Sequence, residues 1–305
     1  MGQHEHSHHH ANNLQGKKLL WVALLNFSIT IVQIIGGIIS NSLSLISDAL
    51  HNLGDSSAIF IAFIAGKKSQ EKPNKQHTFG YKRIEILAAL FNAVVLISIS
   101  IFLFFEAYKR FANPEPIKGK IMFIVATFGL LANLISVFVL QKEKNHNLNI
   151  RAAYLHLMGD TLSSVAVILG GIGIWLYQIY WIDPVITILV GVFIIYHTWA
   201  VVKETVDILM QSTPADLDLN KLKESIEGLE DIENIHHIHA WKLNDSQTHF
   251  EAHLNLTSDV NMSQMMHIKE SVENILKEKF KIKHTTLQVG YKCCKGNDNL
   301  IADKH

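Results

Sequence analysis

The stretch SLISDALHNLGDSSAIFIAFIA, residues 44–65, is long and apolar enough for a membrane span, yet it carries a histidine and two aspartates. His51 and Asp55 are four positions apart. On an α-helix, residues at this spacing lie on one face, about one turn apart, so an imidazole nitrogen and a carboxylate oxygen can bind the same ion. The stretch therefore predicts a membrane helix that supplies half of a metal site.

A second copy of this pattern lies about a hundred residues downstream. The apolar segment 153–177, AYLHLMGDTLSSVAVILGGIGIWLY, repeats the H-x-x-x-D spacing with His156 and Asp160. Four ligands of mixed nitrogen and oxygen type fit a tetrahedral site for a divalent ion, with zinc as the first choice. A single intramembrane histidine can equally be a hydrogen-bonded packing residue, but ionisable groups in lipid are costly and mark ion pathways. Two copies with the same spacing favour the metal site.

Other polar residues in or beside the apolar runs leave two interpretations open. They can belong to an ion pathway or form hydrogen bonds between helices. These residues are Asn26, Asp48, Asn52, Asn92 and Asn133. His197, in the last apolar segment, is interpreted as structural.

The composition indicates a membrane protein. Hydrophobic residues make up 49% of the chain, charged residues 18%, and the mean hydropathy is +0.19. The apolar residues are gathered into segments of about 20 residues, the length that a membrane-spanning helix needs. Six such spans are predicted: 19–39, 43–65, 84–105, 119–140, 153–177 and 182–202.

The distribution of Lys and Arg orients the predicted spans. Cytoplasmic loops of membrane proteins carry an excess of these residues. One side holds twelve: Lys17, Lys18, Lys67, Lys68, Lys72, Lys75, Lys82, Arg83, Lys142, Lys144, Arg151 and Lys203. The other side holds four: Lys109, Arg110, Lys118 and Lys120. Both termini are therefore expected in the cytoplasm. The basic loop 67–83 can also hold anionic lipid, but topology alone accounts for its charge.

The residues quoted above belong to a longer resemblance. SLISDALHNLGD, HTFGYKRIEILAALFNA, RAAYLHLMGDTLSS and WIDPVITILVGVFI, in that order, resemble the cation diffusion facilitator family of zinc transporters, of the zinc, cadmium and cobalt efflux type. The resemblance continues through IHHIHAWKL and TTLQVG and covers about residues 15–290. It implies a homodimer of six-helix protomers that exports zinc from the cytosol against protons.

The resemblance also implies a site and a selectivity. By match of motifs, the transport site falls on His51, Asp55, His156 and Asp160. In this family a histidine at the first of these positions goes with preference for zinc, and an aspartate goes with broader tolerance of cadmium. This chain has the histidine.

After residue 210 the composition becomes that of a soluble domain, predicted over 211–292. Apolar periodicity predicts helices over 217–229 and 262–280 and strands over 232–243, 248–257 and 284–291. The order αββαβ fits a small two-layer α+β domain. The resemblance adds that it is a ferredoxin-like cytoplasmic domain. The remaining divisions are a tail over 1–16, a six-span membrane domain over 17–210 and a tail over 293–305.

The soluble domain is rich in histidine, with His236, His237, His239, His249, His253, His267 and His284, followed by the adjacent Cys293 and Cys294. On neighbouring strands, His236 and His253 can face each other, while His237 and His239 are expected on the opposite face. The resemblance implies zinc bound at the dimer interface, with His236 and His253 favoured over His239 and His284. Gly290 replaces an acidic ligand of many relatives.

Two further histidine features lie outside these sites. The N-terminal MGQHEHSHHH cannot pack and has no signal-peptide pattern, so it is expected to be a disordered zinc collector, with a cloning tag as the alternative. His77 opens HTFGYKRIE. The resemblance offers it as a ligand of a loop zinc site, while a solvated loop histidine is the alternative.

Two other classes of function are disfavoured because the sequence lacks their motifs. There is no G-x-x-x-x-G-K-[ST] for an ATP-driven pump and no H-E-x-x-H for a metalloprotease. A zinc sensor remains an alternative that zinc flux would exclude. The expected protein is a metal–proton antiporter and not an enzyme, in a bacterial plasma membrane. Its partners are a second copy, lipid, divalent metal ions and protons, without nucleic acid.

Overall fold

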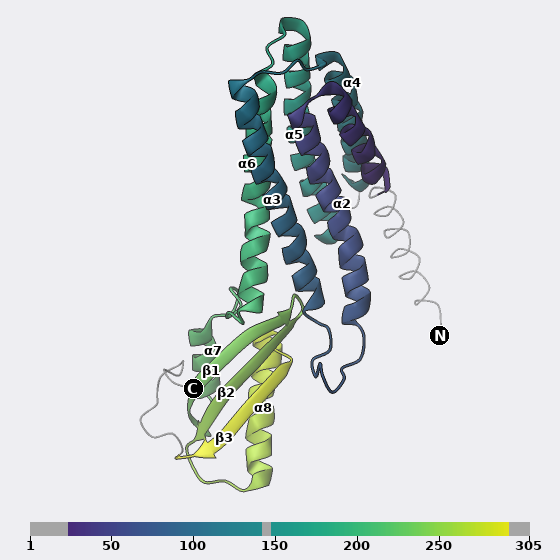
Figure 1. Cartoon of the computed structure of the whole chain (residues 1–305). Coiled ribbons are helices and arrows are strands. Elements are labelled where there is room, and N and C mark those ends of the chain that lie inside the picture. The colour runs from purple at the N-terminus through teal and green to yellow at the C-terminus, as the bar shows by residue number, and fades with distance from the viewer. Residues whose placement is uncertain (1–23, 142–147, 293–305) are drawn as a thin grey trace, which may run out of the picture. The chain divides into compact units, whose positions relative to one another are not determined.

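In the computed structural model the described residues are 24–141 and 148–292, and for residues 59, 140, 148–153, 155 and 156 the description is confined to the backbone. The first two thirds of this chain form long helices (Figure 1). They are Leu24–Ser40, α2 (Leu43–Ser69), α3 (Ile84–Ala112), α4 (Gly119–Gln141), α5 (Leu148–Tyr177) and α6 (Ile182–Leu209). Each of the six predicted spans corresponds to one of these helices.

Four of these helices are long and apolar enough, by length and composition, to cross a membrane. They are α3, α6 and the stretches Gly119–Val139 of α4 and Leu157–Tyr177 of α5. Leu24–Ser40 is apolar but shorter within the described residues. In contrast, α2 falls outside this group although it has 27 residues. Its mean hydropathy is lowered by the polar residues that gave the first indication of a site.

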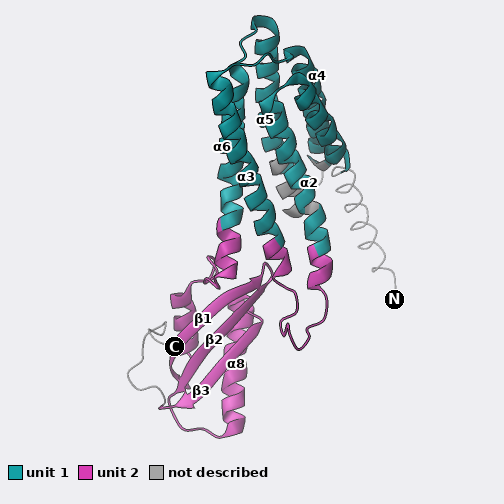
Figure 2. Cartoon of the chain, viewed as in Figure 1, with its two compact units in different colours: residues 1–64, 88–202 teal, residues 65–87, 203–305 magenta. Residues whose placement is uncertain are grey.

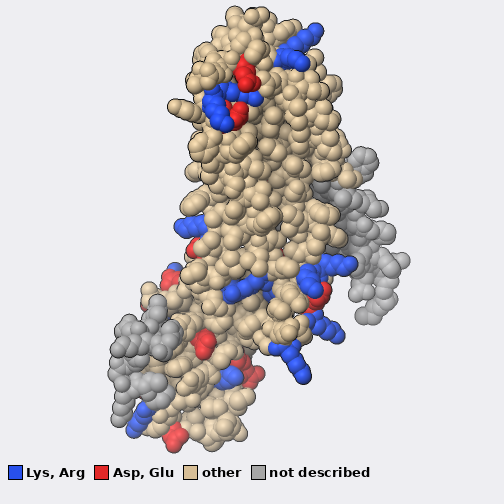
Figure 3. All heavy atoms as spheres, in the orientation of Figure 1, with Lys and Arg blue, Asp and Glu red and all other residues tan. Residues whose placement is uncertain are grey.

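The helical unit exposes large apolar side chains and buries charged ones. Phe63, Phe102 and Leu162 are 72%, 65% and 71% exposed, whereas Asp48 and Asp160 are 1% and 3% exposed. On the face shown in Figure 3, the middle of the helices carries a broad band without Lys, Arg, Asp or Glu. Lipid solvates such an apolar surface, while polar groups are stable only in the interior. This part of the chain is a multi-pass membrane domain.

Glycine lets α4 and α5 approach each other closely. A Cβ atom on Gly119 would lie 2.6 Å from the backbone nitrogen of Trp175, and one on Gly171 would lie 3.0 Å from that of Phe123. Because lipid provides no hydrophobic force between helices, close backbone contact is a main source of their association. Gly119 and Gly171 are therefore packing positions between α4 and α5.

The C-terminal domain has the predicted order αββαβ. Its elements are α7 (Leu219–Glu227), β1 (Ile232–Asn244), β2 (Gln247–Leu256), α8 (Met262–Phe280) and β3 (His284–Tyr291). The sheet order is β1-β2-β3, with β1 and β2 antiparallel and β2 and β3 parallel. A continuous core includes the fully buried Leu222, Phe250 and Val272, which join both helices to the sheet. This is the mixed α+β fold expected of a ferredoxin-like domain.

Local signals explain where the two helices of this domain begin. The Asp218 carboxylate accepts hydrogen bonds from the backbone N–H groups of Asn220 and Lys221, which caps α7. Asn261 and Gln264 form a reciprocal capping box at the start of α8. Such caps satisfy N–H groups that have no partner within the helix.

The chain divides into two compact units (Figure 2). The first comprises residues 1–64 and 88–202, and the second comprises residues 65–87 and 203–305. The connection between α2 and α3 therefore belongs to the same unit as the α+β domain. This assignment was not expected from the composition, which placed the whole stretch 17–210 in the membrane domain.

Candidate metal centre

The first unit brings together three of the four predicted transport ligands. His51 Nε2 lies 3.2 Å from Asp160 Oδ1 and 3.5 Å from Asp55 Oδ2. One ligand atom from each residue lies within 4.8 Å of the other two. His51 and Asp160 are buried and Asp55 is partly buried. Two helices far apart in the sequence thus meet at a cluster of one imidazole and two carboxylates.

These distances suit a small tetrahedral site. Zinc binds histidine nitrogen and carboxylate oxygen at about 2.0–2.1 Å, which places neighbouring ligand atoms of a tetrahedron about 3.3 Å apart. The two measured separations from His51 Nε2, 3.2 and 3.5 Å, lie on either side of that value. The chemistry of the donors fits zinc and other borderline divalent ions.

The fourth predicted ligand is His156, whose side chain lies outside the described residues. Its backbone belongs to α5, one helical turn before Asp160. By helical spacing, position 156 is therefore on the same face of α5 as Asp160. Its part in the site remains a prediction.

A hydrogen-bonded network lies one turn along α2 from the cluster. Asp48 Oδ1 accepts a hydrogen bond from Ser163 Oγ at 2.7 Å, and Asp48 Oδ2 accepts one from Gln33 Nε2 at 2.8 Å. Asn52 Nδ2 donates to Gln33 Oε1 at 3.2 Å. For Asp48 and Asn52, the interpretation as hydrogen bonds between helices is therefore the one that the structure supports. The network links Leu24–Ser40, α2 and α5 beside the candidate ligands.

Gln33 and Ser163 were not singled out in the sequence, although each leaves a signal there. Gln33 is, with Asn26, one of two amides in the apolar segment 19–39, and Ser163 lies three residues after Asp160, on the same helical face. Gly129 on α4 makes room for Gln33, because a Cβ atom there would lie 2.5 Å from Gln33 Nε2. Gln33 and Ser163 thus hold the Asp48 carboxylate in place beside the candidate ligands.

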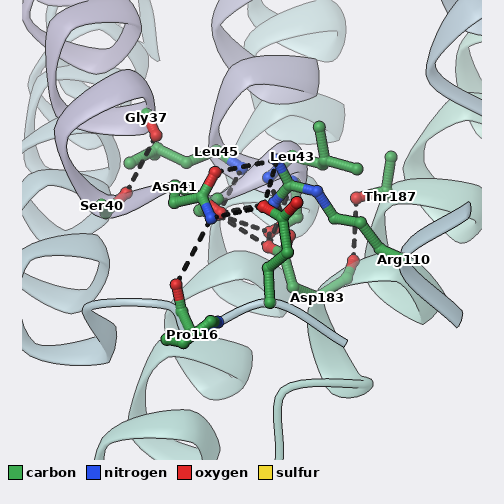
Figure 4. Close-up of polar contacts among 12 residues, drawn as sticks. Gly37, Ser40, Asn41, Leu43, Leu45, Arg110, Pro116, Asp183 and Thr187 are labelled. Carbon is green, nitrogen blue, oxygen red and sulfur yellow. Dashed lines mark hydrogen bonds and ion pairs between the residues drawn. The ribbon is translucent and has the colours of Figure 1, made fainter. Parts of the chain in front are cut away.

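A further buried carboxylate, from another helix, lies at the other end of α2 (Figure 4). Asp183, at the start of α6, accepts hydrogen bonds from the backbone N–H groups of Leu43 at 2.7 Å and Ser44 at 3.1 Å. Its Oδ1 also accepts from the hydroxyl groups of Ser42 and Ser44. The Arg110 guanidinium, on α3, lies 4.0 Å from Asp183 Oδ2. Asp183 therefore caps α2 from a different helix.

The polar contacts around Asp183 extend to the turn before α2. Arg110 donates hydrogen bonds to the carbonyl oxygen and the Oδ1 atom of Asn41. Asn41 has a φ of 59°, a left-handed conformation that asparagine tolerates better than most residues. Its Nδ2 donates to Glu115 Oε2 at 2.9 Å. Leu24–Ser40, α2, α3 and α6 are thus joined by polar contacts at one end of the first unit.

In the α+β domain, four histidines lie in one row of ring contacts. His236 and His253 are opposite each other on β1 and β2, with ring centroids 5.5 Å apart. The His237 ring stacks on His253 at 4.6 Å and contacts His239 at 4.9 Å. Burial, His237 and His236 together lower the pKa of His253, which favours the neutral imidazole that binds metal.

The expectation that His237 lies opposite His236 and His253 is wrong. The pairing of β1 with β2 shifts between His236 and His239, and His237 has a φ of 54°. A bulge of this kind inserts an extra residue and redirects the side chains that follow, so strict alternation no longer holds. The side chain of His237 therefore lies on the same face of the sheet as that of His253.

The other candidate of this domain, His284, lies elsewhere within the chain. It is opposite His249, with ring centroids 4.2 Å apart, whereas His253 is opposite Gln288. Four residues along β2 separate the two positions, about 13 Å at the rise of a strand. One protomer therefore does not bring His284 to the other three candidate ligands.

His77 lies in the connection between α2 and α3. Its backbone N–H donates to Asn74 Oδ1 at 2.8 Å, and its ring lies 4.6 Å from the ring of Tyr81. Among the described residues, three metal-ligating side chains come together in the His51 cluster, and no such group includes His77. Cys293, Cys294 and the N-terminal histidines lie outside the described residues.

Comparison with known families covers almost all of this structure. Residues 19–210 match the model of the cation efflux transmembrane domain, and residues 214–290 match that of the cation efflux protein cytoplasmic domain. The chain belongs to the cation efflux family. The membrane match includes all four predicted transport ligands, and the second match includes the histidine row.

Several cation efflux proteins are similar along nearly their whole length. Zinc transporter ZitB of Pectobacterium atrosepticum is 35% identical over 95% of this chain and 90% of its own. Metal cation efflux system protein CzcD of Cupriavidus metallidurans is 35% identical, with 96% and 92% covered. A cadmium, cobalt and zinc/H(+)-K(+) antiporter of Bacillus subtilis is 36% identical, with 92% and 91% covered. The chain therefore belongs with efflux transporters for zinc, cadmium and cobalt.

Proposed function

We propose that this protein exports Zn²⁺ from the cytosol in exchange for protons, with cadmium and cobalt as further candidate cargo. His51, Asp55, His156 and Asp160 form the transport site in this proposal. The observation that carries it is the contact of His51 Nε2 with carboxylates from both α2 and α5 inside a membrane domain. The names of the similar transporters support the choice of metal.

Protons enter the mechanism through the ligands themselves. Zinc binds neutral imidazole and ionised carboxylate, so metal binding releases protons and protonation releases metal. When alternating access exposes the site first to the cytosol and then to the other side, zinc leaves as protons arrive. The same side chains then carry both ions in opposite directions.

Orientation and assembly complete the proposal. The twelve Lys and Arg residues on one side of the spans against four on the other favour both termini in the cytoplasm. The bacterial relatives favour the inner membrane. The match of residues 214–290 to the cytoplasmic domain supports a homodimer, in which each protomer holds its own transport site.

The deciding experiment measures zinc and proton flux in proteoliposomes that contain the purified chain. Asp160→Asn removes an anionic ligand and should abolish both fluxes while the protein stays folded. Glu106→Gln is the matched control, because it makes the same change in an α3 carboxylate that pairs with Lys109 outside the cluster. Wild-type flux in Asp160→Asn would contradict the site. Zinc binding without flux in the unaltered protein would identify a sensor.

A further inference from the structure

The second unit contains a cavity of about 430 Å³ outside the histidine row. Residues 76–83, between α2 and α3, form one side, and Gln211 with Trp241 and Leu243 of β1 forms the other. The ring of Phe79 contacts His249 of β2 edge to face, at 5.3 Å between centroids. This volume lies within the range of about 300–1,000 Å³ that is typical of small-molecule sites.

The lining of the cavity is positively charged. Lys82 and Arg83 both contribute to it, and among the described residues that line it there is no Asp or Glu. Gln76, Thr78 and Gln211 add neutral polar groups. Two cations without a carboxylate, beside groups that donate hydrogen bonds, favour an anion as the occupant.

Arg83 carries the strongest indication of a missing partner. Its Nε atom is buried and has no hydrogen-bond partner among the described residues. A buried donor without a partner destabilises the folded protein, and a bound acceptor would remove that cost. The planar guanidinium group matches the oxygen atoms of a phosphate and can donate two parallel hydrogen bonds to it.

The position of Arg83 in the chain supplies a source of phosphate. Ile84, the next residue, begins the membrane-spanning helix α3. The cavity therefore includes residues at the membrane boundary, where phospholipid headgroups are found and where anionic lipids attract basic residues.

We propose that this cavity binds a phosphate group, carried by an anionic phospholipid headgroup or supplied as inorganic phosphate. Arg83 and Lys82 hold the phosphate oxygens, and Trp241 and Leu243 form an apolar wall beside them. A bound phosphate joins residues 76–83 to β1. The inference does not depend on the transport site, which contains none of these residues.

The test uses the full chain in neutral detergent at constant ionic strength. Soluble short-chain phosphatidylglycerol and inorganic phosphate are titrated separately, and the rise in the thermal unfolding midpoint reports binding. The variants are Lys82→Gln and Arg83→Gln. Lys75→Gln is the control, because this exposed lysine lies in the same connection but does not line the cavity. Each cavity variant is expected to weaken binding about fivefold, since one basic residue near an anionic surface contributes about 1 kcal/mol.

The two probes separate the sources of phosphate. Binding of both shows that the phosphate group suffices, and binding of phosphatidylglycerol alone assigns the site to lipid; both results support the proposal. No saturable binding of either probe overturns it. Equal weakening by Lys75→Gln also overturns it, because the charge would then act diffusely. If Arg83→Gln fails to fold, the test rests on Lys82→Gln. Unchanged phosphate binding in Lys82→Gln would then overturn the proposal.

Discussion

The backbone N–H of Leu43 donates a hydrogen bond of 2.7 Å to Asp183 Oδ2, so a carboxylate on α6 fixes the first turn of the helix that carries His51 and Asp55. Ordinary N-caps come from the residue just before the helix, and here Ser42 also fills that role, with its Oγ accepting from Leu45 N–H. The cap from Asp183 additionally sets the position of α2 against α6.

Replacing Asp183 by Asn should destabilise the membrane domain. The amide NH₂ group cannot accept the hydrogen bonds that the carboxylate accepts, and Arg110 would lose its buried counter-charge. We expect a loss of about 3 kcal/mol in the free energy of unfolding, as for other broken buried ion pairs, seen as a lower thermal midpoint. Thr187→Val is the control, because Thr187 Oγ1 donates its hydrogen bond to the backbone carbonyl of Asp183. Equal midpoints for the two variants would contradict the role of the carboxylate.

His51→Asp should change metal preference. An aspartate replaces a fixed nitrogen donor with a carboxylate that binds through one or both oxygens, so the site can expand around a larger ion. Cadmium is therefore expected to gain relative to zinc. Competition between the two metals for flux into proteoliposomes measures this change. If the ratio of cadmium flux to zinc flux is unaltered, His51 does not determine the metal selectivity.

The apparent affinity for zinc should fall as the pH falls through the imidazole range. Protonated histidine has no lone pair for metal, and an unperturbed histidine titrates near pH 6.5. Zinc titrations of the purified protein between about pH 5.5 and 7.5 measure the effect around that value. Asp160→Asn is the comparison, since it removes one of the groups that bind both ions. A constant affinity across this range would argue against competition between zinc and protons.

The α+β domain should lose stability in acid through His249. Burial, His284 and Arg83 all lower the pKa of His249, so the unfolded chain binds a proton at higher pH than the folded one. Stability from this group is therefore present above the ordinary pKa of about 6.5 and is lost as the pH falls below it. Denaturant unfolding of the full chain, followed at several pH values, should show a smaller pH slope in His249→Gln. An identical pH slope in the unaltered chain and in His249→Gln would show that His249 does not contribute to the loss of stability in acid.

Much of the fold could be predicted because lipid imposes a simple pattern. Apolar runs of about 20 residues identify spans, and they led to six helices that the structure contains. Apolar periodicity predicts the boundaries of α8 and β3. The capping residues Asn261 and Gln264 mark the start of α8. The repeated spacing placed His51 and Asp160 in one predicted site, and their side chains lie 3.2 Å apart.

Other features depend on contacts that spacing cannot express. The bulge after His236 moves His237 to the face of His253, because one extra residue interrupts the alternation of β1. The cap on α2 joins residues about 140 positions apart, which no local pattern reveals. The separation of His284 from His253 depends on the register of β3 against β2.

The polar stripe of α2 also bears on how the protein enters the membrane during synthesis. An aspartate in an isolated membrane helix opposes insertion, by about 3 kcal/mol at the helix centre, and Asp48 lies in the second turn of α2. Asp48 is offset by Gln33, which is made earlier, and by Ser163, which leaves the ribosome more than a hundred residues later. We therefore expect α5 to stabilise the insertion of α2, and α2 alone to insert poorly in a glycosylation-mapping assay. Because the polar residues of α2 bond to α5, stable insertion of α2 is expected to depend on the synthesis of α5.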